Sequence, residues 1–186
     1  RTAHLLGEID HLLGDRLNAG LRARLRSEVD ERVLTPFEAR DDFHWQRPPA
    51  GNWNAVCHAG SALAALYLGA DRDRVAELVA KAVRGLEDYL EGFEPDGCTT
   101  EGLSYWNFGL GHYAMLAAEL AARTGGRLSL LSPPVLREAA RFPLRVQLSP
   151  GRHVPFSDAR ETTDVDPYLA CRLGEAFDVP ALVAAG

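Results

Sequence analysis

A mostly helical chain of paired antiparallel helices is the fold that this sequence predicts. Leu and Ala dominate the composition, and runs with the alternation of a β-strand are scarce. Between residues 52 and 123, two segments that are apolar on nearly every side enclose one with a single apolar face. This inner, outer, inner order is typical of helical hairpins that stack on one another, repeating at about fifty residues. We therefore expect an all-α, incomplete (α/α) toroid or helical-hairpin array.

Two amphipathic helices are expected before residue 35. The second, residues 21–34, has apolar residues on one face and solvated charges elsewhere, and Thr35-Pro36 either closes it or begins another helix. The first, residues 3–18, carries an apolar stripe at helical spacing: Leu5, Leu6, Ile9, Leu12, Leu13 and Leu17.

A proline-bounded loop is expected over residues 41–51. It carries His44 and Trp45, which could line a sugar-binding surface, because loops often carry function. The same two rings could instead anchor the loop to the core. The sequence leaves both interpretations open.

Three long helices form the centre of the predicted array. Asn52 is a good N-cap for a buried helix over residues 53–68. Asp71 caps an amphipathic outer helix over 72–90. A loop over 91–102 then leads to a second buried helix, residues 104–123.

The last third of the chain reads as shorter elements. A turn over residues 124–134 precedes a short helix, 135–142, that ends before Pro143. Residues 144–148 alternate and could be extended. A further helical pair begins near Pro167 and Pro180 and still reads as helix at the last residues. We expect residues 1–186 to be a single toroid segment, a fragment of a longer protein.

Composition excludes several classes of protein. The net charge of -6 argues against a dedicated nucleic-acid binder, although a locally positive cleft can still hold an anion. Lys81 is the only lysine; the arginines suit bidentate recognition of carboxylates, or they reflect a compositional bias of the source. Three widely spaced cysteines give neither a disulfide framework nor zinc-ligand spacing. We find no bilayer-spanning run and no signal-peptide pattern, so we expect no membrane partner.

Two polar and aromatic clusters stand at the starts of the two buried helices. Alternate helices of an antiparallel array point the same way, so both starts should lie at one end of the bundle. Asn52 stands where a helix dipole favours an anion, and Asn54 and His58 are four residues apart on one face. Glu101 and Tyr105 flank the second start. Together these groups could support proton abstraction beside a carboxylate.

Each of these residues also has a purely structural interpretation. Asn52 could be only an N-cap, His58 a core histidine with its hydrogen bonds satisfied, and Tyr105 a core aromatic residue. Their convergence at one end of the bundle favours a site, and the sequence alone leaves both interpretations open.

At these residues the chain resembles the heparinase II/III-like polysaccharide lyases, of the alginate and heparin lyase type. The resemblance covers roughly residues 45–158. It rests on three short motifs: Asn52-Trp53-Asn54-Ala55-Val56, then Pro95-Asp96-Gly97 with Glu101-Gly102 and Tyr105-Trp106, and Phe156-Ser157-Asp158. It implies an incomplete α/α toroid followed by a β-sandwich domain, and eliminative cleavage of an anionic, uronic-acid-containing polysaccharide.

The resemblance also implies roles for individual residues. Tyr105 matches the catalytic tyrosine, a proton donor that in many members is also the base. Asn52 matches the carboxylate-neutralising asparagine best by spacing, and His58, several residues further on, is the counterpart of a toroid histidine. No cofactor is expected in this segment, because the family's structural zinc and a further catalytic histidine belong to the β-sandwich. The residues expected to contact substrate are Asn54, Trp53, Glu101, Trp106, His44 and Trp45.

The resemblance implies a periplasmic or secreted location and leaves a cytoplasmic one open. Two other functions remain open at this point. One is a glycoside hydrolase on an α/α barrel, with a carboxylate pair drawn from Asp96, Glu101 and Asp158. The other is a non-catalytic helical scaffold that binds a glycan or a peptide.

Overall fold

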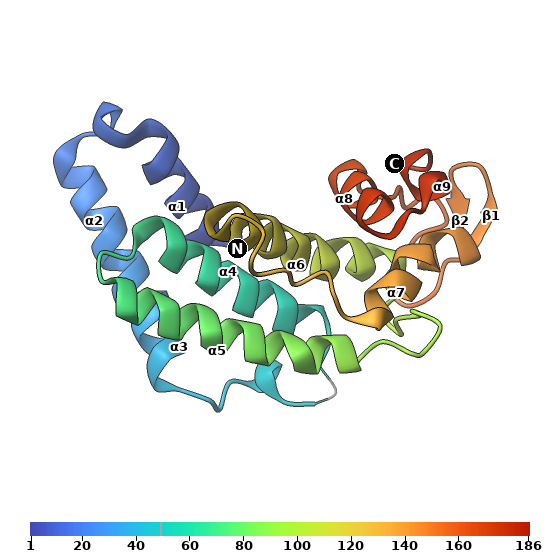
Figure 1. The fold of residues 1–186 in the computed structure, drawn as a ribbon, viewed down its shortest axis with the longest axis horizontal. Helices are drawn as coiled ribbons and strands as arrows, with labels where there is room; N and C mark the ends of the chain where they lie inside the picture. Colours follow the sequence, from blue (N-terminus) through green and yellow to red (C-terminus); the bar gives the residue numbers. More distant parts are fainter. Residues whose placement is uncertain (49) are drawn as a thin grey trace.

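The computed structural model describes residues 1–48 and 50–186, so Pro49 of the expected loop over 41–51 lies outside the described residues. The described chain is mostly helical, as predicted, with one short two-stranded sheet (Figure 1). The α-helices are α1 Thr2–Leu13, α2 Ala19–Val29, α3 Thr35–Ala39, α4 Asn52–Leu68, α5 Arg72–Glu91, α6 Gly102–Thr124, α7 Pro134–Arg145, α8 Pro167–Phe177 and α9 Pro180–Val183. The strands are β1 Gln147–Ser149 and β2 Arg152–His153, paired antiparallel.

Helix α4 is the centre of the packing. It lies against α1, α5 and α6 (Figure 1), and most of its residues are buried whichever way they point. Helix α6 is buried in the same way, whereas α5 buries a single face that includes Leu78, Ala82 and Leu86. The expected alternation of buried and amphipathic helices is therefore confirmed. The arrangement of these helices as a toroid stays a prediction.

The prediction that Thr35-Pro36 closes or restarts the second helix is correct only in part. Helical backbone runs from Ala19 to Ala39, because a π-helical turn, Asp30–Leu34, joins α2 to α3. In that turn the Thr35 N–H donates to the Asp30 carbonyl, five residues back. Pro36 then falls in the first turn of α3, where the missing N–H of a proline is tolerated.

The prediction that a helix ends before Pro143 is wrong. Helix α7 continues through Pro143 to Arg145, so residues 144–145 are helical and the extended segment begins at Gln147. A proline inside a helix leaves the carbonyl four residues earlier without its donor, here Ala139. The indole Nε1–H of Trp106 donates to that carbonyl at 2.9 Å. A side chain of α6 thus replaces the missing backbone hydrogen bond.

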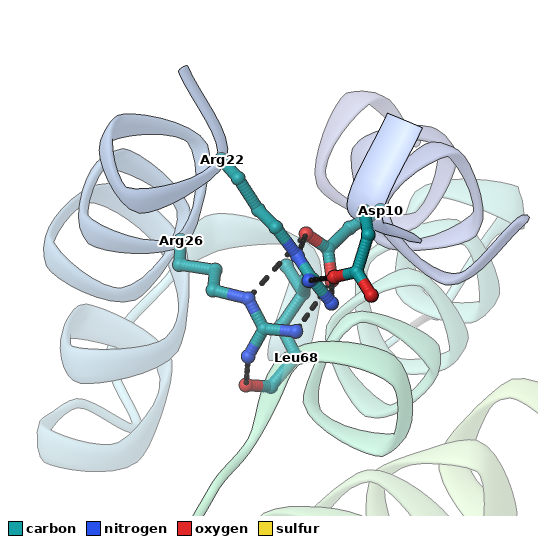
Figure 2. A network of polar contacts seen from close by, with 5 residues as sticks. Asp10, Arg22, Arg26 and Leu68 are labelled. Atoms are coloured by element: carbon teal, nitrogen blue, oxygen red, sulfur yellow. Dashed lines mark hydrogen bonds and ion pairs between the residues drawn. The ribbon is translucent and has the colours of Figure 1, made fainter. Parts of the chain in front are cut away.

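A buried carboxylate ties the first two helices to α4 (Figure 2). Asp10 on α1 is 1% exposed, and it accepts hydrogen bonds from Arg22, at 2.7 Å from Nε, and from Arg26. Arg26 also donates to the carbonyl of Leu68 at the end of α4. Burial by itself raises the pKa of Asp10, but the hydrogen bonds and charges of the two arginines outweigh it, so the pKa lies below its ordinary value.

We expect Asp10→Asn to lower the free energy of unfolding by about 1–3 kcal/mol, because two partly exposed guanidinium groups lose their shared charged acceptor. Urea denaturation measures the loss. Because the folded pKa is depressed, the contribution of Asp10 is present above the unfolded pKa and disappears as pH falls through the folded one. The matched control is Asp15→Asn, since the fully exposed Asp15 contacts the same Arg22 and should matter little. Equal effects of the two variants would contradict this.

Candidate functional site

The start of α4 binds a carboxylate. The backbone N–H of Asn52 donates to Oε2 of Glu101 at 2.7 Å, and its side-chain Nδ2 donates to Oε1 at 2.6 Å. Asn52 is the first residue of α4 and Gly51 is the residue at the N-cap position. The predicted role of Asn52 as a side-chain N-cap is therefore wrong. A free helical N–H and the positive end of the helix dipole both favour an anion at this position.

Gly51 leaves the space that this carboxylate occupies. A Cβ at residue 51 would lie 2.9 Å from Oε1 of Glu101, closer than such atoms approach one another. Glu101 itself directly precedes α6. One ion–amide contact therefore joins the starts of the two buried helices, which the sequence predicts to lie at one end of the bundle.

Tyr105 stands one turn further along, in the first turn of α6, and is partly exposed. The nearby Asp158 carboxylate raises the pKa of Tyr105, first as a hydrogen-bond acceptor and then through its charge; burial and the charge of Glu101 raise it further. Asn52 and Tyr105 thus share Glu101 as a neighbour. No hydrogen bond joins these two directly among the residues that the structure describes.

The loop that carries Asp158 packs directly on the start of α6. The Ser104 hydroxyl donates to the Asp158 carbonyl at 3.3 Å. At Gly102, φ is +77° and a Cβ would lie 2.6 Å from the Phe156 carbonyl oxygen, so glycine is required there. Ser157 also has a positive φ, 52°, which is uncommon outside glycine and clusters at functional sites. Three motifs far apart in the sequence therefore converge around Glu101 and Tyr105.

Asn54 and His58 lie deeper in the molecule and face a different neighbour. Asn54 has no exposed surface, and His58 is 2% exposed. The ring nitrogen Nδ1 of His58 lies 3.1 Å from the Asn54 carbonyl oxygen and 3.0 Å from its Oδ1. Burial lowers the pKa of His58 to about 4, so the ring is neutral at neutral pH. His58 lines a pocket beside α5 that includes neither Asn52 nor Tyr105, so the structure does not bring the three together.

The aromatic residues expected to contact substrate divide into two groups. Trp45 lies with its ring centroid 4.9 Å from that of His58 and 5.3 Å from that of Phe43, so it anchors the loop. His44 is exposed, and its ring centroid lies 6.3 Å from that of Trp53. Trp53 is the second residue of α4 and is 62% exposed. These two rings are open to a ligand. Trp106 is fully buried and leaves no surface for a polysaccharide.

Sequence reasoning missed two features of this site. It did not pair Glu101 with Asn52, 49 residues away. The glycine at position 51, directly before the helix, is the signal that could have indicated the close approach of another group. It also gave no role to Tyr89, a buried tyrosine whose pKa is raised well above its ordinary value by burial and by the charge of Glu101.

Glu101→Gln should lower the free energy of unfolding by about 1–3 kcal/mol. The neutral amide of glutamine keeps only one oxygen acceptor, so its NH₂ group would face one of the two N–H groups of Asn52, donor against donor. Thermal or urea unfolding checks this. The control is Glu94→Gln in the same loop: Glu94 is exposed, and its side chain forms no hydrogen bond or ion pair with the described residues. If the control lost as much stability, the carboxylate contact at α4 would have no special weight.

Within residues 1–48 and 50–186, no group of three or more His, Cys, Asp or Glu side chains could hold a metal ion. No helix in that part of the chain combines the length and the apolar character needed to cross a bilayer. In comparisons with known proteins, no family model and no curated protein matches the chain.

Proposed function

We propose that this chain is the helical segment of a polysaccharide lyase, which cleaves a uronic-acid-containing chain by β-elimination. The observation that carries the proposal is the carboxylate held by Asn52 at the start of α4, beside Tyr105. A uronate presents the same chemical group next to the proton that must be removed. Resemblance to the heparinase II/III-like lyases, at the motifs that converge here, supports the same conclusion.

In this proposal Glu101 occupies the place that the substrate carboxylate takes. Glu101 is partly exposed, so its side chain can move aside without opening the core. The substrate carboxylate then accepts from the backbone N–H and the amide of Asn52. When the C5 proton leaves, negative charge spreads onto that carboxylate, and fixed donors with a helix dipole stabilise it most at that moment.

The proton transfers belong to Tyr105. Its ionised oxygen takes the C5 proton, the electron pair of that bond forms the C4=C5 double bond, and the bond from C4 to the glycosidic oxygen breaks. The phenol then returns the proton to the departing oxygen, so one residue serves as base and then as acid. The carboxylates of Asp158 and Glu101 hold the free enzyme in the neutral phenol form, because both raise the pKa of Tyr105.

The remaining residues surround this centre. Trp53 and His44 form an exposed ring pair beside the carboxylate site and can pack against a sugar ring. Asn54 and His58 are buried residues of the first two turns of α4, and their contribution in this proposal is to position that helix. Trp106 supports α7 from within the core.

On the full-length protein that contains this segment, we expect Tyr105→Phe to lower kcat by about 10²–10⁴-fold, because the proton carrier is lost. The measurement is the ultraviolet absorbance of the unsaturated uronate product. Tyr168→Phe is the control, since Tyr168 is an exposed tyrosine on α8 and should not affect the rate.

The products separate this proposal from its two alternatives. Saturated reducing ends that depend on a carboxylate rather than on Tyr105 would indicate a glycoside hydrolase. Binding with no turnover on any uronate polymer would indicate a scaffold.

The pH dependence tests the role of Asp158. Because the pKa of Tyr105 is raised above its ordinary value of about 10, we expect kcat/KM to keep rising with pH into the alkaline range. Asp158→Asn removes the largest cause of that shift, so the rising limb should move to lower pH. Asp164→Asn, which removes an exposed carboxylate from the same loop, should leave the profile in place. A profile that is unchanged in Asp158→Asn would show that Asp158 does not raise the pKa of the titrating base.

A further inference from the structure

A polar pocket lies between α5 and the loop that follows α3. Its volume is about 670 Å³, within the range of sites that hold small molecules. His58 lines it from α4, Arg84 and Asp88 from α5, and Gln46 from the loop. It shares no lining residue with the site around Glu101.

The geometry of His58 fixes which ring nitrogen faces this pocket with a lone pair. Nδ1 lies beside the Asn54 backbone carbonyl, which can only accept, so Nδ1 carries the hydrogen. Nε2 is therefore the unprotonated nitrogen. His58 as a residue is 2% exposed, and its Nε2 has no hydrogen-bond partner among the described residues. Nε2 is not one of the fully enclosed side-chain atoms that lack a partner, so it keeps contact with the open side of the pocket. An unpaired acceptor at the edge of a pocket can accept a hydrogen bond from a ligand hydroxyl or from water.

Gly85 leaves the opening through which Nε2 reaches the pocket. A Cβ at residue 85 would lie 2.1 Å from Nε2 of His58, so alanine there would collide with the ring. Glycine inside a helix costs about 0.5–1 kcal/mol relative to alanine. Within α5, the glycine at position 85 leaves room for the imidazole ring of His58 and keeps its lone pair accessible.

The walls of the pocket carry balanced charge. Lys81 forms an ion pair with Asp41 at 2.6 Å across the pocket lining. Arg84 and Asp88 lie four residues apart on α5, and neither forms an ion pair with another described residue. Burial, countered in part by Asp88 and reinforced by Lys81, lowers the pKa of His58 to about 4, so the ring itself adds no charge at neutral pH. An anion would meet two carboxylates there, and a cation would meet two basic groups.

We propose that this pocket binds a neutral polyhydroxyl ligand, such as an uncharged sugar residue, with a ligand hydroxyl donating to Nε2 of His58. Hydroxyl groups both donate and accept, so one ring can pair with the His58 acceptor, the Asp88 carboxylate and the Arg84 guanidinium together. The pocket is a site apart from the proposed elimination chemistry and does not depend on it.

The test is a titration of the ¹⁵N-labelled chain with cellobiose, followed by the NMR signal of His58 Nε2. We expect a saturable change at His58 and smaller changes at the other five of the six histidines. Glucuronate and glucosamine, each carrying a charge, should bind more weakly. No saturable change with cellobiose, or tighter binding of either charged sugar, would overturn the proposal.

Variants identify the residues responsible. Arg84 lies on the exposed face of α5. Arg84→Gln should weaken cellobiose binding about tenfold, the effect of losing one charge-assisted hydrogen bond. Gly85→Ala should abolish the response, whereas Gly111→Ala, a helical glycine with nothing within 4 Å of the added Cβ, should preserve it. Tyr105→Phe should also preserve it, which separates this site from the lyase proposal. An unchanged midpoint in Arg84→Gln would show that cellobiose binds elsewhere.

Discussion

The contact between Glu101 and the start of α4 determines how the two buried helices meet. Both oxygens of one carboxylate are held by the backbone and side-chain N–H groups of Asn52, 49 residues earlier in the chain. Gly51 makes room for it, and Gly102 lets the loop around Asp158 pack against α6. The position of Tyr105 relative to Asn52 follows from these contacts, so the candidate site depends on the hydrogen bonds between Asn52 and the Glu101 carboxylate.

Local periodicity was enough to predict the three central helices, because their cores depend on apolar residues that recur within each segment. The bounds of α4, α5 and α6 differ from the expected ones by one or two residues. The capping of α4 was not predictable in the same way. Asn52 has the local signature of an N-cap, but a carboxylate from a distant loop binds its amide instead. Local rules rank only the partners that lie nearby in sequence.

The arrangement of the candidate site could be predicted only in part, for the same reason. The spacing of four residues correctly places Asn54 and His58 on one face of α4, where the structure shows a hydrogen bond between them. It does not say which neighbouring helix that face meets, and the structure turns it toward α5 and the rings of Phe37 and Trp45. That Asn52 and Tyr105 lie at the same end of the bundle, by contrast, depends only on the direction of alternate helices, which follows from their order in the chain.

Trp106 and Pro143 form a pair whose members need one another. The indole supplies the donor that proline withholds from the Ala139 carbonyl, so loss of the tryptophan leaves a buried oxygen unsatisfied inside an otherwise intact helix. Replacing Pro143 by a residue with a backbone N–H would supply a second donor to the Ala139 carbonyl oxygen. That N–H would then compete with the Trp106 indole for the same acceptor. Neither position can therefore change freely while the other stays the same, although 37 residues (143 minus 106) separate them.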